Sequence, residues 1–294
     1  MFCLVSVALA VKPEMKRVFK WTQRSAWDRV FRAILADRIN ETVLAEARRL
    51  NPRYISDDDF AWLSELVTVV TRQAPVDIPA LLATSLSCHY EYIVAFHATK
   101  SDSAADFLTR GIRLSDTSFL ERRARELFGE SDVVNQAIAV LRQSGYARHN
   151  NGRVYLALTK SVCIREHSHY MLYGSEYLAR IADRIGRSAE LRSVGSPLIV
   201  ECLIPRAALS SEFWRGRSFA MLEDYFTRVL RPAEIGQVRP SCVVVTQPIP
   251  AEHVLRVHEF TEARGPVPCE KAGTEEPRPC ERRRLRLVRI WAGG

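Results

Sequence analysis

The sequence predicts an α+β protein in which a helical segment comes first and a small sheet with further helices follows. From residue 20 to about residue 88, apolar side chains recur at steps of three and four, which is typical of amphipathic helices. From Tyr92 to about Phe260, short apolar segments that fit strands alternate with helical segments, and several connections are too long for β-hairpins. We therefore expect a small helical domain at 20–88 and an α+β domain at 89–262.

The helical segment contains recognisable start signals. Trp27 and Phe31 belong to the apolar stripe of a first helix, and Asn40 can cap a second one. Ser56 is followed by three aspartates, so it can begin a third helix ahead of the apolar residues that start at Phe60. Because no residue pattern here indicates chemistry, we expect this segment to serve packing or partner binding.

The α+β segment divides into five predicted strands and four predicted helices. The strands are Tyr92–Ala98, Arg153–Leu158, Leu198–Ile204, Cys242–Thr246 and His253–Phe260. The helices are Ala104–Arg110, Phe119–Leu127, Val133–Arg142 and Tyr170–Ile185. Gly111 stands where a left-handed glycine would end the first of these helices.

Composition favours a globular chain with anionic partners. The chain of 294 residues has 47% hydrophobic residues and a net charge of +8, from 42 basic and 34 acidic residues. This basic excess favours nucleotides, nucleic acid or an acidic protein, although a generic basic surface explains it equally well. The seven cysteines form no CxxC pair, so we expect reduced thiols in a cytoplasmic protein and no structural metal.

Both ends differ from the rest of the chain. Residues 1–10 are apolar, but no positive segment precedes them and they are shorter than a signal peptide or a membrane span. We expect residues 1–19 to be a disordered leader and the protein to make no membrane contact. Residues 263–294 contain four prolines and scattered charge, which predicts a disordered basic tail.

The first candidate site is the segment Phe96-His97-Ala98-Thr99. Apolar residues 93–96 lie in the predicted strand Tyr92–Ala98, and the polar residues from Thr99 to Asp102 predict a turn directly after it. A histidine at such a strand tip can present its ring to a ligand. The alternative is a core histidine bound by a neighbouring carbonyl.

The second candidate site begins with a turn signal at Asn150-Asn151-Gly152. It continues into a strand that carries Tyr155 among aliphatic residues, followed by a turn that contains Ser161. On the next predicted helix, Tyr170, Tyr173 and Tyr177 would share one face. Such tyrosines can stack on a flat heteroaromatic ring, or they can be core residues.

In this order, the two segments resemble the ADP-ribosyltransferase fold, in its His–Tyr–Glu branch of poly(ADP-ribose) polymerases and diphtheria-type toxins. The resemblance covers roughly Tyr92 to Phe260. It implies a split, mostly antiparallel sheet that binds NAD as a substrate, without a metal. It further implies transfer of ADP-ribose to a protein, nucleic acid, small molecule or water with release of nicotinamide. A bacterial toxin or a phage-defence effector would fit such a protein.

The resemblance also implies roles for individual residues on the first strand. His97 would hydrogen-bond the ribose next to the nicotinamide, and Thr99 matches the hydroxyl of the motif. Ala98 stands where the family usually has glycine, and its side chain would crowd a backbone that approaches the carboxamide.

On the second segment, Tyr155 matches the first tyrosine that stacks on the nicotinamide. Tyr170 or Tyr173 would be the second, and the long connection after Ser161 leaves that choice open. By the same resemblance, Ser161 belongs to the residues that bind NAD.

The catalytic glutamate of the family has no direct counterpart, because no acid begins the late strand at 242–246. Glu201 lies inside an apolar strand, where an ionised carboxylate is costly unless it is paired, so we rank it first. Glu176 follows the tyrosines and ranks second, and Glu234 ranks third. The alternative for Glu201 is an edge-strand side chain that faces solvent.

Three other functions remain open. An RNA 2′-phosphotransferase-like enzyme on the same fold would use His97 with Arg110, Arg113 and Arg153. A non-catalytic module could bind a nucleotide or a partner peptide, and a helical interaction protein would depend on residues 20–88. The chain has no P-loop, Rossmann fingerprint, His-Glu-x-x-His or nucleophile elbow, which argues against the commoner kinases and hydrolases.

Overall fold

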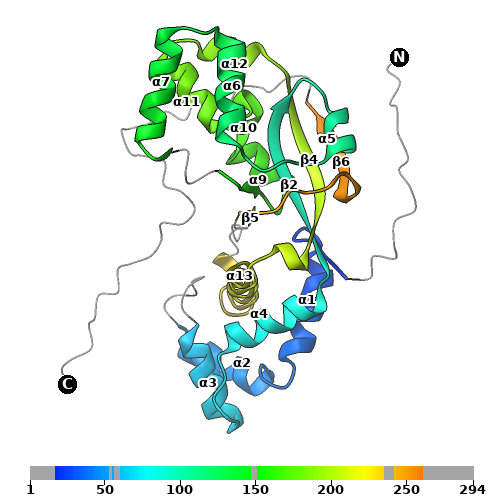
Figure 1. Cartoon of the computed structure of the whole chain (residues 1–294). Helices are drawn as coiled ribbons and strands as arrows, with labels where there is room; N and C mark the ends of the chain where they lie inside the picture. The colour runs from blue at the N-terminus through cyan, green and yellow to red at the C-terminus, as the bar shows by residue number, and fades with distance from the viewer. Residues whose placement is uncertain (1–16, 53–54, 56–59, 147–150, 235–241, 261–294) are drawn as a thin grey trace, which may run out of the picture.

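The computed structural model describes residues 17–52, 55, 60–146, 151–234 and 242–260. Figure 1 shows a sheet in the middle of the molecule, with one group of helices below it and another beside its upper part, on the left. The predicted tail and most of the predicted leader lie outside the described residues. Within the leader, Val18 and Phe19 form strand β1.

The main sheet has the strand order β1-β2-β4-β6. Its centre is the antiparallel pair of β2 (Tyr92–Ser101) and β4 (Ser196–Pro205), which are hydrogen-bonded along their full length. Strand β6 (Val254–Glu259) pairs antiparallel with β4, whereas β1 (Val18–Phe19) pairs parallel with β2. The sheet is therefore mixed, with mainly antiparallel pairs.

A second, smaller sheet consists of β3 (Val154–Leu156) and β5 (Val243–Val245), which pair antiparallel. It meets the main sheet at one point, where Phe96 and Ala157 exchange two backbone hydrogen bonds of 2.8 Å. The five predicted strands and the α+β class are thus confirmed. This contact brings the strand that carries Tyr155 beside the strand that carries His97.

Helices below the sheet come from two distant parts of the chain. They are α1 (Arg24–Leu35), α2 (Glu41–Leu50), α3 (Ala61–Thr71), α4 (Ile78–His89) and α13 (Ser211–Leu230). The predicted cap of α2 is confirmed, because Asn40 Oδ1 accepts a 3.0 Å hydrogen bond from the Val43 amide. The predicted helix start at Ser56 lies outside the described residues.

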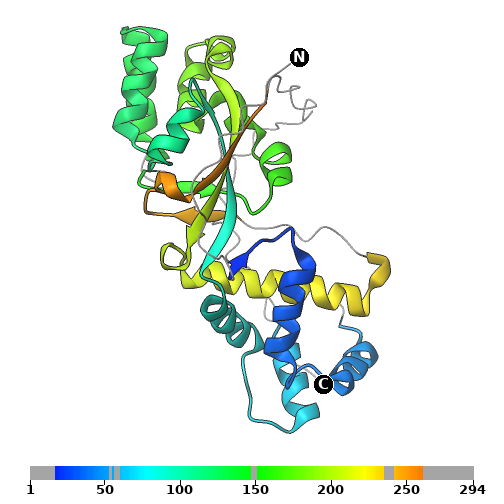
Figure 2. The ribbon, with the colours of Figure 1, turned by 90° about the vertical axis from the view of Figure 1, so that its right-hand side faces the viewer.

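Helix α13 crosses α4 and packs against it (Figure 2). It is also linked to α1 by ion pairs. Asp224 accepts hydrogen bonds from Arg24 and Arg228, and Arg228 also reaches Asp28 at 3.0 Å. One continuous apolar core connects these helices with the sheet, from Phe31 and Phe226 to Ile93 and Val200. The helical layer therefore shares its core with the α+β part.

Beside the upper part of the sheet, a second core joins α6 (Thr117–Phe128), α7 (Asp132–Gln143) and α11 (Glu176–Arg184). Helices α9 (Lys160–Arg165), α10 (Ser168–Tyr173) and α12 (Ser188–Ser193) complete this part. Helix α5 (Ala105–Arg110) lies on the opposite side of the sheet in Figure 1 and contacts β6. Short 3₁₀ helices lie at Arg206–Ala208, Pro232–Glu234 and Ala251–His253. The first three predicted helices of this segment are confirmed as α5, α6 and α7.

Three local predictions are wrong, two of them on the segments with His97 and Tyr170. The single helix predicted at Tyr170–Ile185 is broken: α10 ends at Gly174, which has a φ of +73°, and the Ser175 hydroxyl caps α11. Tyr177 therefore does not share a helix face with Tyr170 and Tyr173. The turn predicted at Thr99 is also wrong, because β2 continues to Ser101 through its pairing with β4. His97 consequently lies within a strand and not at its tip.

The turn predicted around Ser161 is likewise replaced by a helix. Thr159 caps α9 by accepting a hydrogen bond from the Val162 amide, so Lys160 and Ser161 form its first turn. Gly111 ends α5 with a positive φ of +72°, but its ψ of −157° is not that of a left-handed helix. The position still requires glycine, because a Cβ there would lie 2.0 Å from the Ile249 carbonyl oxygen.

Candidate functional site

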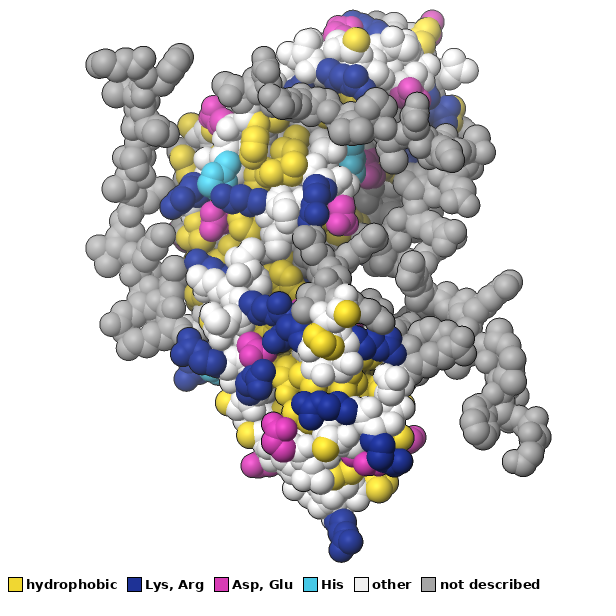
Figure 3. Space-filling model, turned by 180° about the vertical axis from the view of Figure 1, so that it is seen from behind, with side chains coloured by type: hydrophobic (Ala, Val, Ile, Leu, Met, Phe, Trp, Pro, Cys, Tyr) yellow, Lys and Arg dark blue, Asp and Glu magenta, His cyan; other side chains and the backbone are white. Residues whose placement is uncertain are grey.

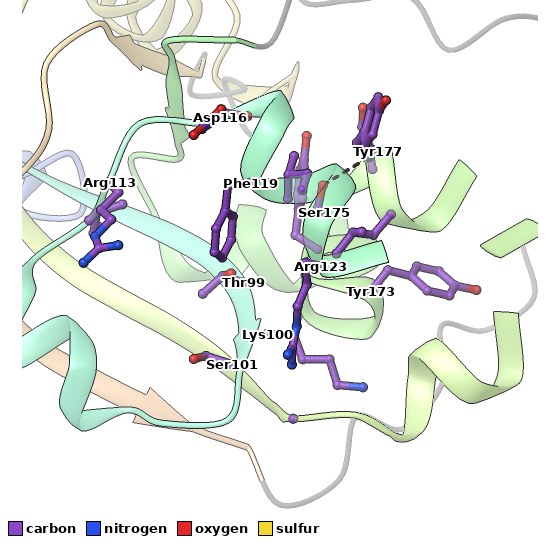
Figure 4. Close-up of a pocket in the computed structure, with 18 of the residues that line it drawn as sticks. Thr99, Lys100, Ser101, Arg113, Asp116, Phe119, Arg123, Tyr173, Ser175 and Tyr177 are labelled. Atoms are coloured by element: carbon purple, nitrogen blue, oxygen red, sulfur yellow. Dashed lines mark hydrogen bonds between the residues drawn. The ribbon is translucent and has the colours of Figure 1, made fainter. Parts of the chain in front are cut away.

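A cavity of about 670 Å³ lies where the main sheet, the small sheet and the upper helices meet (Figure 4). Strand β2 lines it with His97, Thr99 and Ser101, which alternate along one face of the strand. Strand β3 adds Tyr155, the residue that precedes β3 adds Arg153, and helix α6 forms a wall that includes Phe119 and Arg123. Helices α10 and α11 close the cavity with Tyr170, Tyr173 and Glu176.

His97 is half-buried and is bonded to the neighbouring strand. Its Nδ1 lies 3.0 Å from the Tyr155 carbonyl oxygen. Because a carbonyl can only accept a hydrogen bond, Nδ1 carries the proton and Nε2 of the neutral ring is an acceptor. Burial lowers the pKa of His97, so the ring is neutral at physiological pH. The site thus offers a hydrogen-bond acceptor that is fixed in its tautomer.

Two tyrosines lie close to His97. Tyr155 and Tyr170 line the main cavity together with His97, and all three also line a small hollow beside it. Burial raises the pKa of Tyr170. Tyr173 is held differently, because its hydroxyl accepts a 2.8 Å hydrogen bond from Arg192 Nε on α12, and its ring points away from the cavity centre in Figure 4. The structure therefore brings Tyr155 and Tyr170 together and leaves Tyr173 at the edge.

Glu176 contributes the carboxylate of this group. It begins α11, and its Oε1 lies 3.1 Å from His169 Nε2 while its Oε2 accepts a hydrogen bond from the Tyr146 hydroxyl. The bond with His169, followed by that with Tyr146, lowers the pKa of Glu176 to about 2, although burial opposes the shift. The carboxylate is therefore ionised at physiological pH.

Glu201 lies elsewhere. In the antiparallel register of β2 and β4 it stands opposite Phe96, whereas His97 stands opposite Val200. Directly paired residues share one face of a sheet, so Glu201 and His97 project from opposite faces. The Glu201 carboxylate lies 3.4 Å from His258 Nε2 on β6. The structure does not bring Glu201 to the cavity, and the side chain of Glu234 lies outside the described positions.

The remaining predicted residues lie around this group. Thr99 lines the cavity, but only 8% of its surface is exposed. Ala98 alternates with it and points to the opposite face, into a core with Phe96. The Ser161 hydroxyl lies 2.9 Å from that of Thr159, at the start of α9, and is not part of the cavity lining.

Several residues at or beside the cavity were not predicted as site residues from the sequence. Tyr146 and His169 hold Glu176, yet neither belongs to a motif, and only the fold shows their partner. Lys100 donates hydrogen bonds to the carbonyls of Leu172 at 3.3 Å and Leu191 at 3.4 Å, and burial lowers its pKa. Lys100 therefore ties α10 and α12 to the end of β2.

Basic side chains are frequent along the cavity. Arg110, Arg113 and Arg153, which the sequence suggested as phosphate ligands, all line it. Arg123 also lines it and is paired with Asp102 at 2.9 Å. On the face of the molecule shown in Figure 3, by contrast, Lys and Arg side chains are spread over both halves and mixed with acidic and apolar ones. The cavity is thus a place where basic groups from separate elements converge.

Comparisons of the chain with models of known protein families, with curated proteins and with solved structures found no match. Among the described residues, no group of three or more His, Cys, Asp or Glu side chains is placed to hold a metal ion. In the same ranges, every helix is too short or too polar to cross a bilayer.

Proposed function

We propose that the cavity binds NAD and that the protein transfers ADP-ribose from it, with release of nicotinamide. The observation that supports this proposal is the convergence of His97, Tyr155, Tyr170 and Glu176 from four separate elements on one cavity. The cavity of about 670 Å³ lies within the usual range for small-molecule sites, roughly 300–1,000 Å³. An imidazole, two phenols and an ionised carboxylate are the groups that this chemistry needs.

Each group has a role in breaking the glycosidic bond. When the bond between the nicotinamide nitrogen and ribose C1′ breaks, both electrons leave with neutral nicotinamide and positive charge develops on the ribose. The Glu176 carboxylate would stabilise that charge, and it would do so more strongly in the transition state than in the ground state. Tyr155 and Tyr170 would stack on the nicotinamide, and His97 Nε2 would accept a hydrogen bond from a ribose hydroxyl. The acceptor nucleophile then forms the new bond at C1′.

The proposal is tested by incubating the purified chain with NAD and measuring free nicotinamide. We expect the wild type to release nicotinamide and His97→Ala to release it at least tenfold more slowly, because the substitution removes the acceptor at the ribose. It also removes the hydrogen bond to the Tyr155 carbonyl, but it leaves the strand pairing in place, so we expect an unchanged circular dichroism spectrum. Absence of release by the wild type, or equal rates for both proteins, would contradict the proposal. Labelled NAD added to a cell extract then separates protein from nucleic-acid acceptors.

A second candidate function, RNA 2′-phosphotransfer, is favoured by the position of Arg110, Arg113 and Arg153 in the same cavity. Guanidinium groups suit the oxygen atoms of a phosphate. Under this alternative, nicotinamide is released only in the presence of an oligonucleotide with a 2′-phosphate, and Arg113→Gln abolishes this release. Release with NAD alone favours the first proposal, and NAD binding without release favours a non-catalytic module.

A further inference from the structure

Phe119 is an exposed aromatic side chain in the cavity wall. Its exposed fraction is 51%, and among the large hydrophobic side chains exposed in the described parts of the chain it is the only aromatic one. It is also the only one of that set that lines the cavity. Single exposed apolar residues are common on protein surfaces, so the significance of Phe119 depends on how its ring is held.

Helix α6 is fixed on both sides of Phe119. At its start, the Thr117 amide donates to Asn151 Oδ1 at 3.2 Å, and the Ser115 amide donates to the Arg153 carbonyl at 3.1 Å, which ties this end to β3. One turn beyond Phe119, the ion pair of Arg123 with Asp102 ties the helix to the end of β2. Phe119 and Arg123 are four residues apart, so they share a helix face. The ring is therefore held towards the cavity while it stays open to solvent.

Guanidinium groups lie on both sides of the Phe119 ring, in a lining that also contains acidic side chains such as Asp116. Figure 4 shows its ring in the middle of the lining, with Arg113 on one side and Arg123 on the other. Arg110 and Arg113 line the same cavity, and neither forms an ion pair with any other residue that the structure describes. An aromatic face with the Arg113 guanidinium group beside it suits a ligand that combines a flat ring with negative charge, such as a nucleotide.

We infer that Phe119 is the stacking surface for the adenine ring of the bound nucleotide. The inference rests on the proposed function, in which Tyr155 and Tyr170 contact the nicotinamide. NAD has a second flat ring joined to the first through a pyrophosphate, and Phe119 with Arg113 offers the second aromatic and cationic contact in the same cavity. Phe119 then determines specificity, because it favours dinucleotides over ligands that lack the adenylate.

The test is equilibrium binding of three ligands by calorimetry: NAD, ADP-ribose and nicotinamide mononucleotide. The proteins are the wild type, Phe119→Ala, Phe119→Leu and Val133→Ala. Val133→Ala is the matched control, because it removes an exposed apolar side chain on α7, outside the cavity. We expect Phe119→Ala to lower the affinity for NAD and for ADP-ribose about tenfold, the usual loss when an aromatic stacking partner is removed. Phe119→Leu keeps apolar bulk without a ring and should lose most of the same affinity. Binding of nicotinamide mononucleotide should not change, and Val133→Ala should match the wild type.

Two results overturn the inference: wild-type affinity for NAD and ADP-ribose in both Phe119 variants, or an equal loss for nicotinamide mononucleotide. A wild type that binds none of the three ligands overturns it as well. These outcomes differ from failure of the proposed function. If the wild type binds ADP-ribose through Phe119 but never releases nicotinamide, the stacking surface stands and the transferase proposal fails. If Phe119→Ala binds NAD and releases nicotinamide like the wild type, the transferase proposal stands and the stacking inference fails.

Discussion

At the scale of single residues, Glu176 and Glu201 show how position decides what a carboxylate can do. Each lies within 3.4 Å of a histidine Nε2, with His169 beside Glu176 and His258 beside Glu201. Only Glu176 lines the cavity that contains His97 and Tyr155. A partner histidine therefore does not distinguish the candidate catalytic glutamate. The distinction is whether the side chain projects into the cavity.

The low pKa of Glu176 leads to a prediction for stability. Its folded-state pKa of about 2 lies below the ordinary value of 4.5, so the folded chain binds fewer protons and this contribution to stability is present above pH 4.5 and lost as the pH falls towards 2. We expect Glu176→Gln to lower the free energy of unfolding at pH 7 by about 1–2 kcal/mol, after allowance for the exposed part of the side chain. Urea unfolding between pH 3 and 7 should show the difference from wild type shrinking below pH 4.5. A difference that does not vary with pH would contradict the assignment.

The sequence predicted some of these residues and could not predict others, for a physical reason. His97 and Tyr155 each follow a local pattern, so both were identified. Glu201 was ranked above Glu176 because a carboxylate in an apolar strand needs a partner, and His258 is that partner. Which face a strand residue occupies depends on the register between β2 and β4, and a shift by one residue would reverse it. Register is a property of two distant segments, so a local pattern does not contain it.

At the scale of elements, the strands were predictable and the long helix α13 was not. Strands stand out as short apolar runs between turn signals. Helix α13 buries Trp214, Ala220, Leu222 and Phe226 on several sides, because it lies among other helices. Such a helix has no single apolar stripe, and periodicity does not reveal it. The break at Gly174 was missed because the tyrosine spacing on both sides continues the helical pattern.

The turn after α5 leads to a prediction about backbone conformation. Gly111 and Gly129 both have a positive φ and an extended ψ, which strains any other residue. A Cβ at Gly111 would lie 2.0 Å from the Ile249 carbonyl oxygen, whereas a Cβ at Gly129 would meet nothing within 4 Å. We expect Gly129→Ala to cost about 1–3 kcal/mol of unfolding free energy from strain alone, and Gly111→Ala to cost roughly 2 kcal/mol more. Urea denaturation measures both, and equal losses would show that the contact with Ile249 is unimportant.

At the scale of the whole molecule, the cavity lies at the junction of parts that are far apart in sequence. Its walls come from residues between 97 and 195, and the sheet beneath them shares its core with helices of both the N-terminal segment and α13. The predicted division near residue 88 follows a change of pattern along the chain. Packing of α13 against α4 crosses that division, because burial of apolar surface does not follow chain order.

The central claim is that the cavity with His97, Tyr155 and Glu176 carries out the reaction. The most direct measurement compares nicotinamide release from NAD by the wild type, Glu176→Gln and Glu201→Gln. Both variants remove a carboxylate that lies beside a histidine, and only one changes the cavity. We predict a loss of at least a hundredfold for Glu176→Gln, the scale of one electrostatic group at a transition state, and near wild-type release for Glu201→Gln. Undiminished release by Glu176→Gln, or loss only in Glu201→Gln, would contradict the account.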